Sequence, residues 1–113
     1  MTDRELLELA AKAAGYNVRW HDIWECFVHE EPYNITNPPT LAGQRLVWVP
    51  LSDDGDALRL GVKLGIDMHF RCSGVYTNIE RLQEEFFEPK YSSDPYAATR
   101  RAIVRAAAEL GKG

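Results

Sequence analysis

The chain has 113 residues, a formal net charge of −4 and a hydrophobic content of 45%. This length supports one hydrophobic core, so we expect a single domain over residues 1–113. The negative charge gives the chain as a whole no attraction to nucleic acid or to an anionic membrane. No apolar run approaches the roughly 20 residues of a membrane-spanning helix. The first residues do not resemble a signal peptide, and two cysteines do not make a disulfide framework, so we expect a cytoplasmic protein.

Residues 3–14 have the pattern of a capped helix. Thr2 and Glu5 fit a capping box, apolar residues then recur at helical spacing, and Gly15 is a natural stop. Residues 16–20 alternate apolar and polar side chains and predict a strand with its aromatic residues and valine on the core face.

Residues 21–44 are expected to form an elaborated loop, because they exceed the usual connection of about 4–6 residues. Pro38 and Pro39 exclude a helix or a central strand at that point. The loop carries three aromatic residues: Trp24, Phe27 and Tyr33. They either fold back on the domain or form a contact surface, and the sequence leaves both open.

Residues 45–49 are apolar on both faces and predict a central strand. The segment 53–64 begins with an acidic run that suits a helix N-terminus, and it ends at Gly65. This helix is apolar on most sides, so we expect the other elements to pack around it. The residues expected to be buried there and in the last helix are Leu58, Leu60, Val62, Ile103 and Ala107.

Residues 66–72 alternate like a half-buried strand, and Ser73-Gly74 marks a tight turn into a partner strand. Residues 80–88 fit either a helix or an edge strand, of which we expect the strand. Asp94-Pro95 predicts the start of a last helix that runs to Leu110 and stops at Gly111. Its expected core stripe consists of Tyr96, Ile103, Ala107 and Leu110.

The order of elements predicts an α+β fold. We expect a mainly antiparallel sheet of four to five strands with helices packed on its faces.

Residues 48–60 and 94–107 resemble the small phage and prophage proteins of the phage ABA sandwich domain family, which are related in style to the NinX-like phage proteins. Residues 5–15 resemble the first helix of that family, so the likeness covers roughly half of the chain. It implies a helix–sheet–helix sandwich and a phage or prophage origin, with the cytoplasm of a bacterial host as the location. It implies no activity and no catalytic residue, because none is established for the family.

Four residues have side chains of the zinc-binding type: Cys26, His29, His69 and Cys72. His69 and Cys72 stand three apart in a predicted strand and would point to opposite faces. We therefore expect Cys72 in the core, His69 in water and no bound metal or other cofactor. The acidic run Asp53, Asp54 and Asp56 is interpreted as a helix cap.

No motif pre-organises a catalytic group. His21, Asp22 and Glu25 could form an acid–base group, but the sequence has no nucleophile elbow and no phosphate-binding loop. We therefore expect that the protein is not an enzyme.

Five basic residues could form a phosphate clamp if the fold brought them together: Arg59, Lys63, Arg100, Arg101 and Arg105. Arg101 and Arg105 share the outer face of the last helix, where they would be solvated, paired with carboxylates or available to a ligand. Replacing both by glutamine is expected to cost less than about 1.5 kcal/mol, because an exposed ion pair contributes at most about 1 kcal/mol. In an acidic chain a nucleic-acid partner is not expected.

The sequence thus favours a non-enzymatic phage or prophage accessory protein. Its partner would be a host protein, a phage protein or a second copy of the chain, bound through the aromatic residues of 21–44. The alternative is a binder of a small ligand or nucleotide phosphate that uses the basic residues, for example against host defence signalling.

Overall fold

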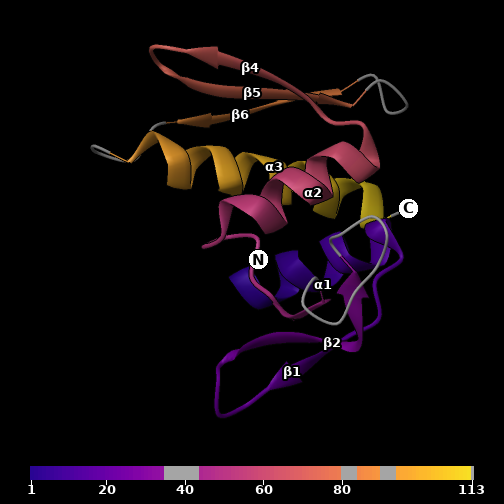
Figure 1. The fold of residues 1–113 in the computed structure, drawn as a ribbon. Helices are drawn as coiled ribbons and strands as arrows, with labels where there is room; N and C mark the ends of the chain where they lie inside the picture. Colours follow the sequence, from indigo (N-terminus) through magenta and orange to yellow (C-terminus); the bar gives the residue numbers. More distant parts are fainter. Residues whose placement is uncertain (35–43, 80–83, 90–93, 113) are drawn as a thin grey trace.

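The computed structural model describes residues 1–34, 44–79, 84–89 and 94–112 (Figure 1). In chain order the elements are α1 (Asp3–Ala14), β1 (Val18–His21), β2 (Cys26–Asn34), β3 (Gln44–Trp48), α2 (Asp54–Leu64), β4 (Asp67–Arg71), β5 (Gly74–Ile79), β6 (Glu84–Pro89) and α3 (Pro95–Gly111).

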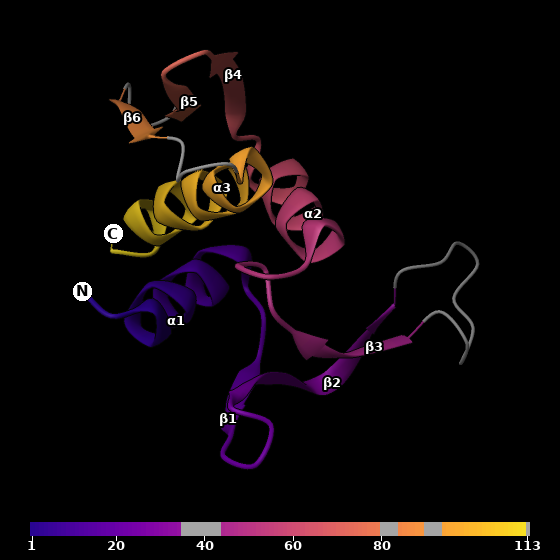
Figure 2. The ribbon, with the colours of Figure 1, turned by 90° about the vertical axis from the view of Figure 1, so that its left-hand side faces the viewer.

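The three helices form a middle layer between two antiparallel sheets of three strands each (Figures 1 and 2). Sheet A has the order β1-β2-β3, and sheet B has the order β4-β5-β6. α3 lies at the centre, because it packs against α1, α2, β5 and β6.

The expected α+β class with antiparallel strands is confirmed. The expected single sheet of four to five strands is not what the chain forms. α2 carries the chain from one side of the helix layer to the other, so strands before and after it cannot pair (Figure 2). The helices therefore lie between two sheets, and do not cover the two faces of one sheet.

Residues 21–44 contain a strand of nine residues, β2, where a loop was expected. β2 lies between β1 and β3, so β3, expected to be central, is an edge strand. The ladder between β2 and β3 shifts register between Val28 and Tyr33. Pro32 falls in that stretch, and proline cannot donate a ladder hydrogen bond. Pro38 and Pro39 lie outside the described residues.

Local side chains start the helices as the sequence predicts. The side chains of Thr2, Asp53 and Asp94 each accept a hydrogen bond from the backbone N–H three residues on, at 2.8–3.2 Å. Gly15 and Gly65 end α1 and α2 in the left-handed conformation.

Gly111 has a different role from the expected stop, because α3 continues through it and is capped by Lys112. A Cβ atom on Gly111 would lie 2.0 Å from the carbonyl oxygen of Leu9. The absent side chain therefore lets α3 approach the backbone of α1.

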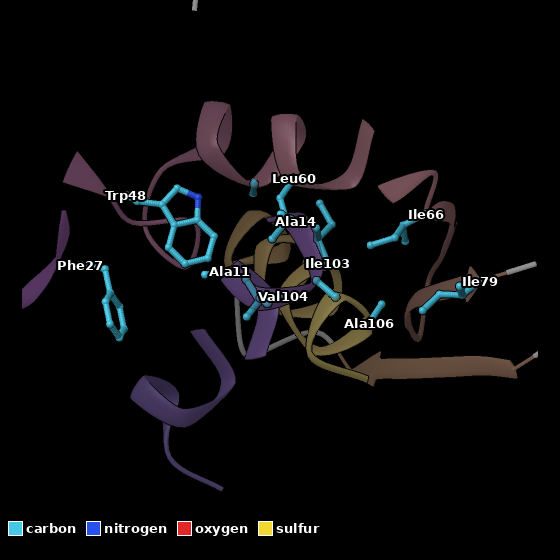
Figure 3. Packing of buried hydrophobic residues seen from close by; sticks show 13 residues of the cluster. Ala11, Ala14, Phe27, Trp48, Leu60, Ile66, Ile79, Ile103, Val104 and Ala106 are labelled. Carbon is cyan, nitrogen blue, oxygen red and sulfur yellow. The ribbon is translucent and has the colours of Figure 1, made fainter. Parts of the chain in front are cut away.

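The core lies among the helices and extends into both sheets (Figure 3). α1 and α3 are rich in small residues. The buried alanines of these two helices are Ala10, Ala11, Ala14, Ala98, Ala102, Ala106, Ala107 and Ala108. Leu60 of α2 and Ile103 of α3 fill the space between their helices (Figure 3). Leu60, Ile103 and Ala107 are buried, as expected.

Three other expectations of burial are wrong. Leu58 and Val62 are exposed, Val62 by 73%, because α2 meets α3 through a single face that includes Leu60 and Gly61. Tyr96 is exposed at the first turn of α3, before that helix reaches the core.

Sheet B follows the sequence pattern more closely. β4 and β5 form the expected hairpin, and the side chains of Val75, Thr77 and Ile79 are buried. The strand predicted over residues 80–88 is confirmed for residues 84–88, which belong to β6. Residues 80–83 lie outside the described residues. Cys72, expected in the core, is exposed in the turn after β4.

Candidate functional site

The turn between β1 and β2 exposes two apolar residues, Ile23 and Trp24, the latter by 53%. The Trp24 ring stacks on His21 with centroids 4.3 Å apart and planes 19° apart. The backbone N–H of Trp24 also donates to His21 Nδ1 at 3.1 Å. Glu25, with a positive φ of 51°, completes the turn. We call Ile23 and Trp24, with the supporting His21, the β1–β2 tip.

The structure separates the three aromatic residues that were expected to form one contact surface. Trp24 lies at the tip, but Phe27 is only 3% exposed and packs edge-to-face on Trp20 at 5.2 Å. Phe27 therefore belongs to the core. The side chain of Tyr33 lies outside the described part. Sequence reasoning missed Ile23, although a turn between two strands could have drawn attention to it.

Two of the five candidate phosphate-binding residues hold the turn before α2. Arg59 Nη2 lies 2.7 Å from Asp56 Oδ1. Arg100 donates from Nε to the carbonyl oxygen of Leu51 at 2.9 Å and pairs through Nη1 with Asp54 at 2.7 Å. Arg59 therefore pairs within its own helix, whereas Arg100 connects α3 to the first turn of α2 and to the residues before it.

The other three candidates have different internal partners. Arg101 and Arg105 of α3 both pair with Glu88 of β6, and Arg101 Nη1 also lies 3.0 Å from Asp3 Oδ1. Glu88 is 1% exposed, so these arginines compensate a buried charge. Lys63 Nζ lies 4.6 Å from the ring centroid of Tyr16. The five residues are thus distributed over three separate groups of contacts.

An open cleft of about 590 Å³ lies between α1 and β1 and brings together other basic residues. Its lining includes Arg4, Lys12 and Arg19, with Trp20 as an aromatic wall. The Arg4 guanidinium lies over the Trp20 ring at 4.5 Å, and Glu8 supplies a carboxylate 3.6 Å from Arg4. No sequence pattern predicted this cluster, because its members come from a helix and a strand that meet only in the fold.

The four possible zinc ligands lie on opposite sides of the helix layer. Cys26 and His29 belong to β2 of sheet A, whereas His69 belongs to β4 of sheet B and Cys72 to the turn that follows it. His29 is buried beside the ring of Tyr16. Within the described ranges, no three His, Cys, Asp or Glu side chains are placed to hold a metal ion together.

The possible acid–base residues lie around the β1–β2 tip. His21 uses Nδ1 to accept the backbone N–H of Trp24, and Asp22 and Glu25 are exposed. The described geometry therefore gives His21 a supporting role for Trp24.

No protein-family model, no curated protein and no solved structure matches this chain. In the part of the chain that the structure describes, every helix is too short or too polar to cross a membrane. Contacts and surfaces of the chain itself therefore provide the basis for a function.

Proposed function

We propose that the chain is a non-enzymatic binding protein that contacts a protein partner through the β1–β2 tip. The observation that supports this most is that Trp24 is half exposed and yet held by two contacts with His21. A large aromatic side chain that is already ordered loses little conformational freedom on binding. Tryptophan is also among the residues that most often dominate the energy of an interface.

The chemistry around the tip indicates what kind of partner surface would fit it. Ile23 and Trp24 supply an apolar centre, and Asp22 and Glu25 supply carboxylates at its margin. The matching surface is an apolar pocket with basic residues at its rim, since charge complementarity favours encounter and orientation.

The resemblance of residues 48–60 and 94–107 to the phage ABA sandwich domain family supports a phage or prophage origin for this protein. We place the chain among phage or prophage accessory proteins that act in the cytoplasm of a bacterial host. The partner would then be a host or phage protein.

A comparison of capture by matched variants tests the role of the tip. The wild-type chain, Trp24→Ser and Tyr96→Ser would be immobilised and exposed to lysates of infected and uninfected bacterial cells. Tyr96 is the control because it is an exposed aromatic residue on a different surface, at the start of α3. We expect Trp24→Ser to lose a partner that the wild type and Tyr96→Ser both retain. Equal capture by all three would refute the proposal.

The cleft between α1 and β1 favours a second candidate function, the binding of a small anionic ligand such as a nucleotide. Three basic side chains and an aromatic wall line it, which suits a phosphate joined to a flat ring. Titration of nucleotides against the wild type, Lys12→Gln and Lys112→Gln tests this, with Lys112 as the basic residue outside the cleft. Binding weakened by Lys12→Gln alone would support it, and no saturable binding to the wild type would exclude it.

A further inference from the structure

β4 is an edge strand of sheet B, and its free side is defined by the hairpin that follows it. A two-residue turn joins β4 to β5, and the pair that closes it, Arg71 and Gly74, forms the hydrogen-bonded type of pair. Alternation along the ladder then directs the backbone groups of Asp67, His69 and Arg71 towards β5. Those of Met68 and Phe70 point to the open edge, where no described strand pairs with them.

The side chains of β4 divide between the two faces of sheet B. Met68 and Phe70 pair with Thr77 and Val75, which are buried, so all four share the face that looks towards the helices. Phe70 is nevertheless 61% exposed, because α3 packs against β5 and β6. The free edge of β4 therefore presents an exposed aromatic ring beside backbone groups that no described strand pairs with, a combination that native edge strands usually avoid. The Phe70 carbonyl oxygen accepts a hydrogen bond from Arg71 Nη1 at 3.1 Å, a contact that an added strand would replace.

We infer that this edge binds a second copy of the chain, as an antiparallel pair of β4 strands related by a two-fold axis at His69. In this register Asp67 lies opposite Arg71 of the second copy, and Met68 lies opposite Phe70. Two-fold symmetry produces each of these contacts twice. The outer face then carries two pairs of opposite charge, and the helix-facing side carries two apolar pairs.

The backbone supports the same register. Pairing at His69 makes Met68 and the opposite Phe70 a hydrogen-bonded pair, and these are the two residues whose N–H and C=O groups face the edge. A shift of the axis to Phe70 would place His69 opposite Arg71 and Asp67 opposite Ser73 in the turn. In that register neither charge pair forms, and the pairing extends beyond the end of β4 into the turn.

α2 also exposes two apolar side chains, Leu58 and Val62. Lys63 points towards sheet A, since it lies over Tyr16. Round the helix, Leu58 is about 100° from Arg59 and about 140° from Lys63, and Val62 is about 60° from Arg59 and about 100° from Lys63. Leu58 and Val62 are exposed, on the side of α2 that faces away from Tyr16.

Charge exchange tests the pairing without disturbing the core, because Asp67 and Arg71 are both exposed. The mass of the full chain in solution would be measured in the micromolar range by sedimentation for the wild type, Asp67→Arg, Arg71→Asp and the variant with both changes. We expect the wild type at twice the mass of one chain, each single variant as a monomer, and the double variant again as a dimer. Mixing the two single variants should produce a dimer of one copy of each, because every cross-strand pair is then of opposite charge.

Glu85→Arg is the matched control, since Glu85 is an exposed carboxylate of sheet B on the far edge strand β6, and it should remain a dimer. A wild type that stays monomeric, or a dimer unchanged by either single variant, would overturn the inference.

A disulfide tests the register independently of these charges. In a background with Cys72→Ser, His69→Cys should link two chains under oxidation, because the residue on the axis faces itself in a non-hydrogen-bonded pair. Asp67→Cys in the same background should not link, because its opposite residue is Arg71. The reverse pattern would overturn the proposed axis. Neither the charge exchange nor the disulfide experiment involves Trp24. A result that refutes the β4 dimer therefore leaves the proposed binding through the β1–β2 tip untouched.

Discussion

The buried carboxylate of Asp56 accepts a hydrogen bond from the backbone N–H of Val49 at 2.9 Å. This contact ties the first turn of α2 to the chain that leaves β3. The same carboxylate receives Arg59 Nη2 at 2.7 Å, and the Asp56 backbone N–H donates to Asp53 at 2.8 Å. The turn between sheet A and the helix layer is thus organised around one acidic side chain.

Asp56→Ala should therefore lower the free energy of unfolding by about 2 kcal/mol, since the partly buried N–H of Val49 loses its acceptor and Arg59 keeps only Asp53, at 3.8 Å. Chemical denaturation measures the loss. Asp54→Ala is the control, because Asp54 is an exposed carboxylate of the same turn that pairs only at the surface with Arg100. Its loss should stay below about 1 kcal/mol. Equal losses would contradict the role given to Asp56.

Leu60→Asp should unfold the domain. Leu60 is fully buried between α2 and α3, and an unpaired buried charge costs several kcal/mol in a domain whose total stability is about 5–15 kcal/mol. Val62→Asp, two residues away on the exposed side of α2, should change stability by less than about 0.5 kcal/mol. Thermal melts followed by circular dichroism in dilute solution separate the two. A cooperative melt of Leu60→Asp near that of the wild type would refute the burial of Leu60 between α2 and α3.

Gly111→Ala should destabilise the protein by about 3 kcal/mol, because the new methyl group would collide with the backbone of Leu9. Gly61→Ala provides the comparison within another helix. There a Cβ atom would lie 3.6 Å from Ile103 Cγ2, an ordinary contact, and alanine favours the helix by up to about 1 kcal/mol. Denaturant midpoints should fall for Gly111→Ala and stay level or rise for Gly61→Ala. A similar change in both would mean that α1 and α3 do not meet at Gly111.

Replacement of Arg101 and Arg105 together by glutamine should lower stability by more than about 2 kcal/mol, since it deprives the buried Glu88 of two cationic partners. This value replaces the loss of less than about 1.5 kcal/mol that we expected from the sequence. That expectation treated the ion pairs of Arg101 and Arg105 as exposed. Adding Glu88→Gln to the double variant should restore much of the loss, because position 88 then carries no buried charge. Equilibrium denaturation of the three proteins provides the test. A double variant as stable as the wild type would show that the ion pairs contribute nothing.

The sequence by itself determined the parts of this protein that depend on neighbours a few residues apart. Thr2, Asp53 and Asp94 cap their helices through backbone groups three positions on, so the helix starts could be predicted to within one residue, with Ser52 as the alternative to Asp53. The β4–β5 hairpin likewise follows from alternation and a short turn. Trp24 could be named as a candidate contact residue, but its support by His21 could not be predicted, because the ring stack depends on how the turn closes.

Only the tertiary structure decided which surfaces meet. The division of the strands into two sheets depends on the path of α2 through the helix layer, a relation between segments far apart in the chain. Glu88 and Arg105 show the same dependence, since a strand and a helix must pack before either charge has a partner. Val62 is exposed and Gly111 is buried against α1 for the same reason. An apolar pattern in the sequence indicates which faces of a helix can be buried. Which elements bury them depends on contacts between distant parts of the chain.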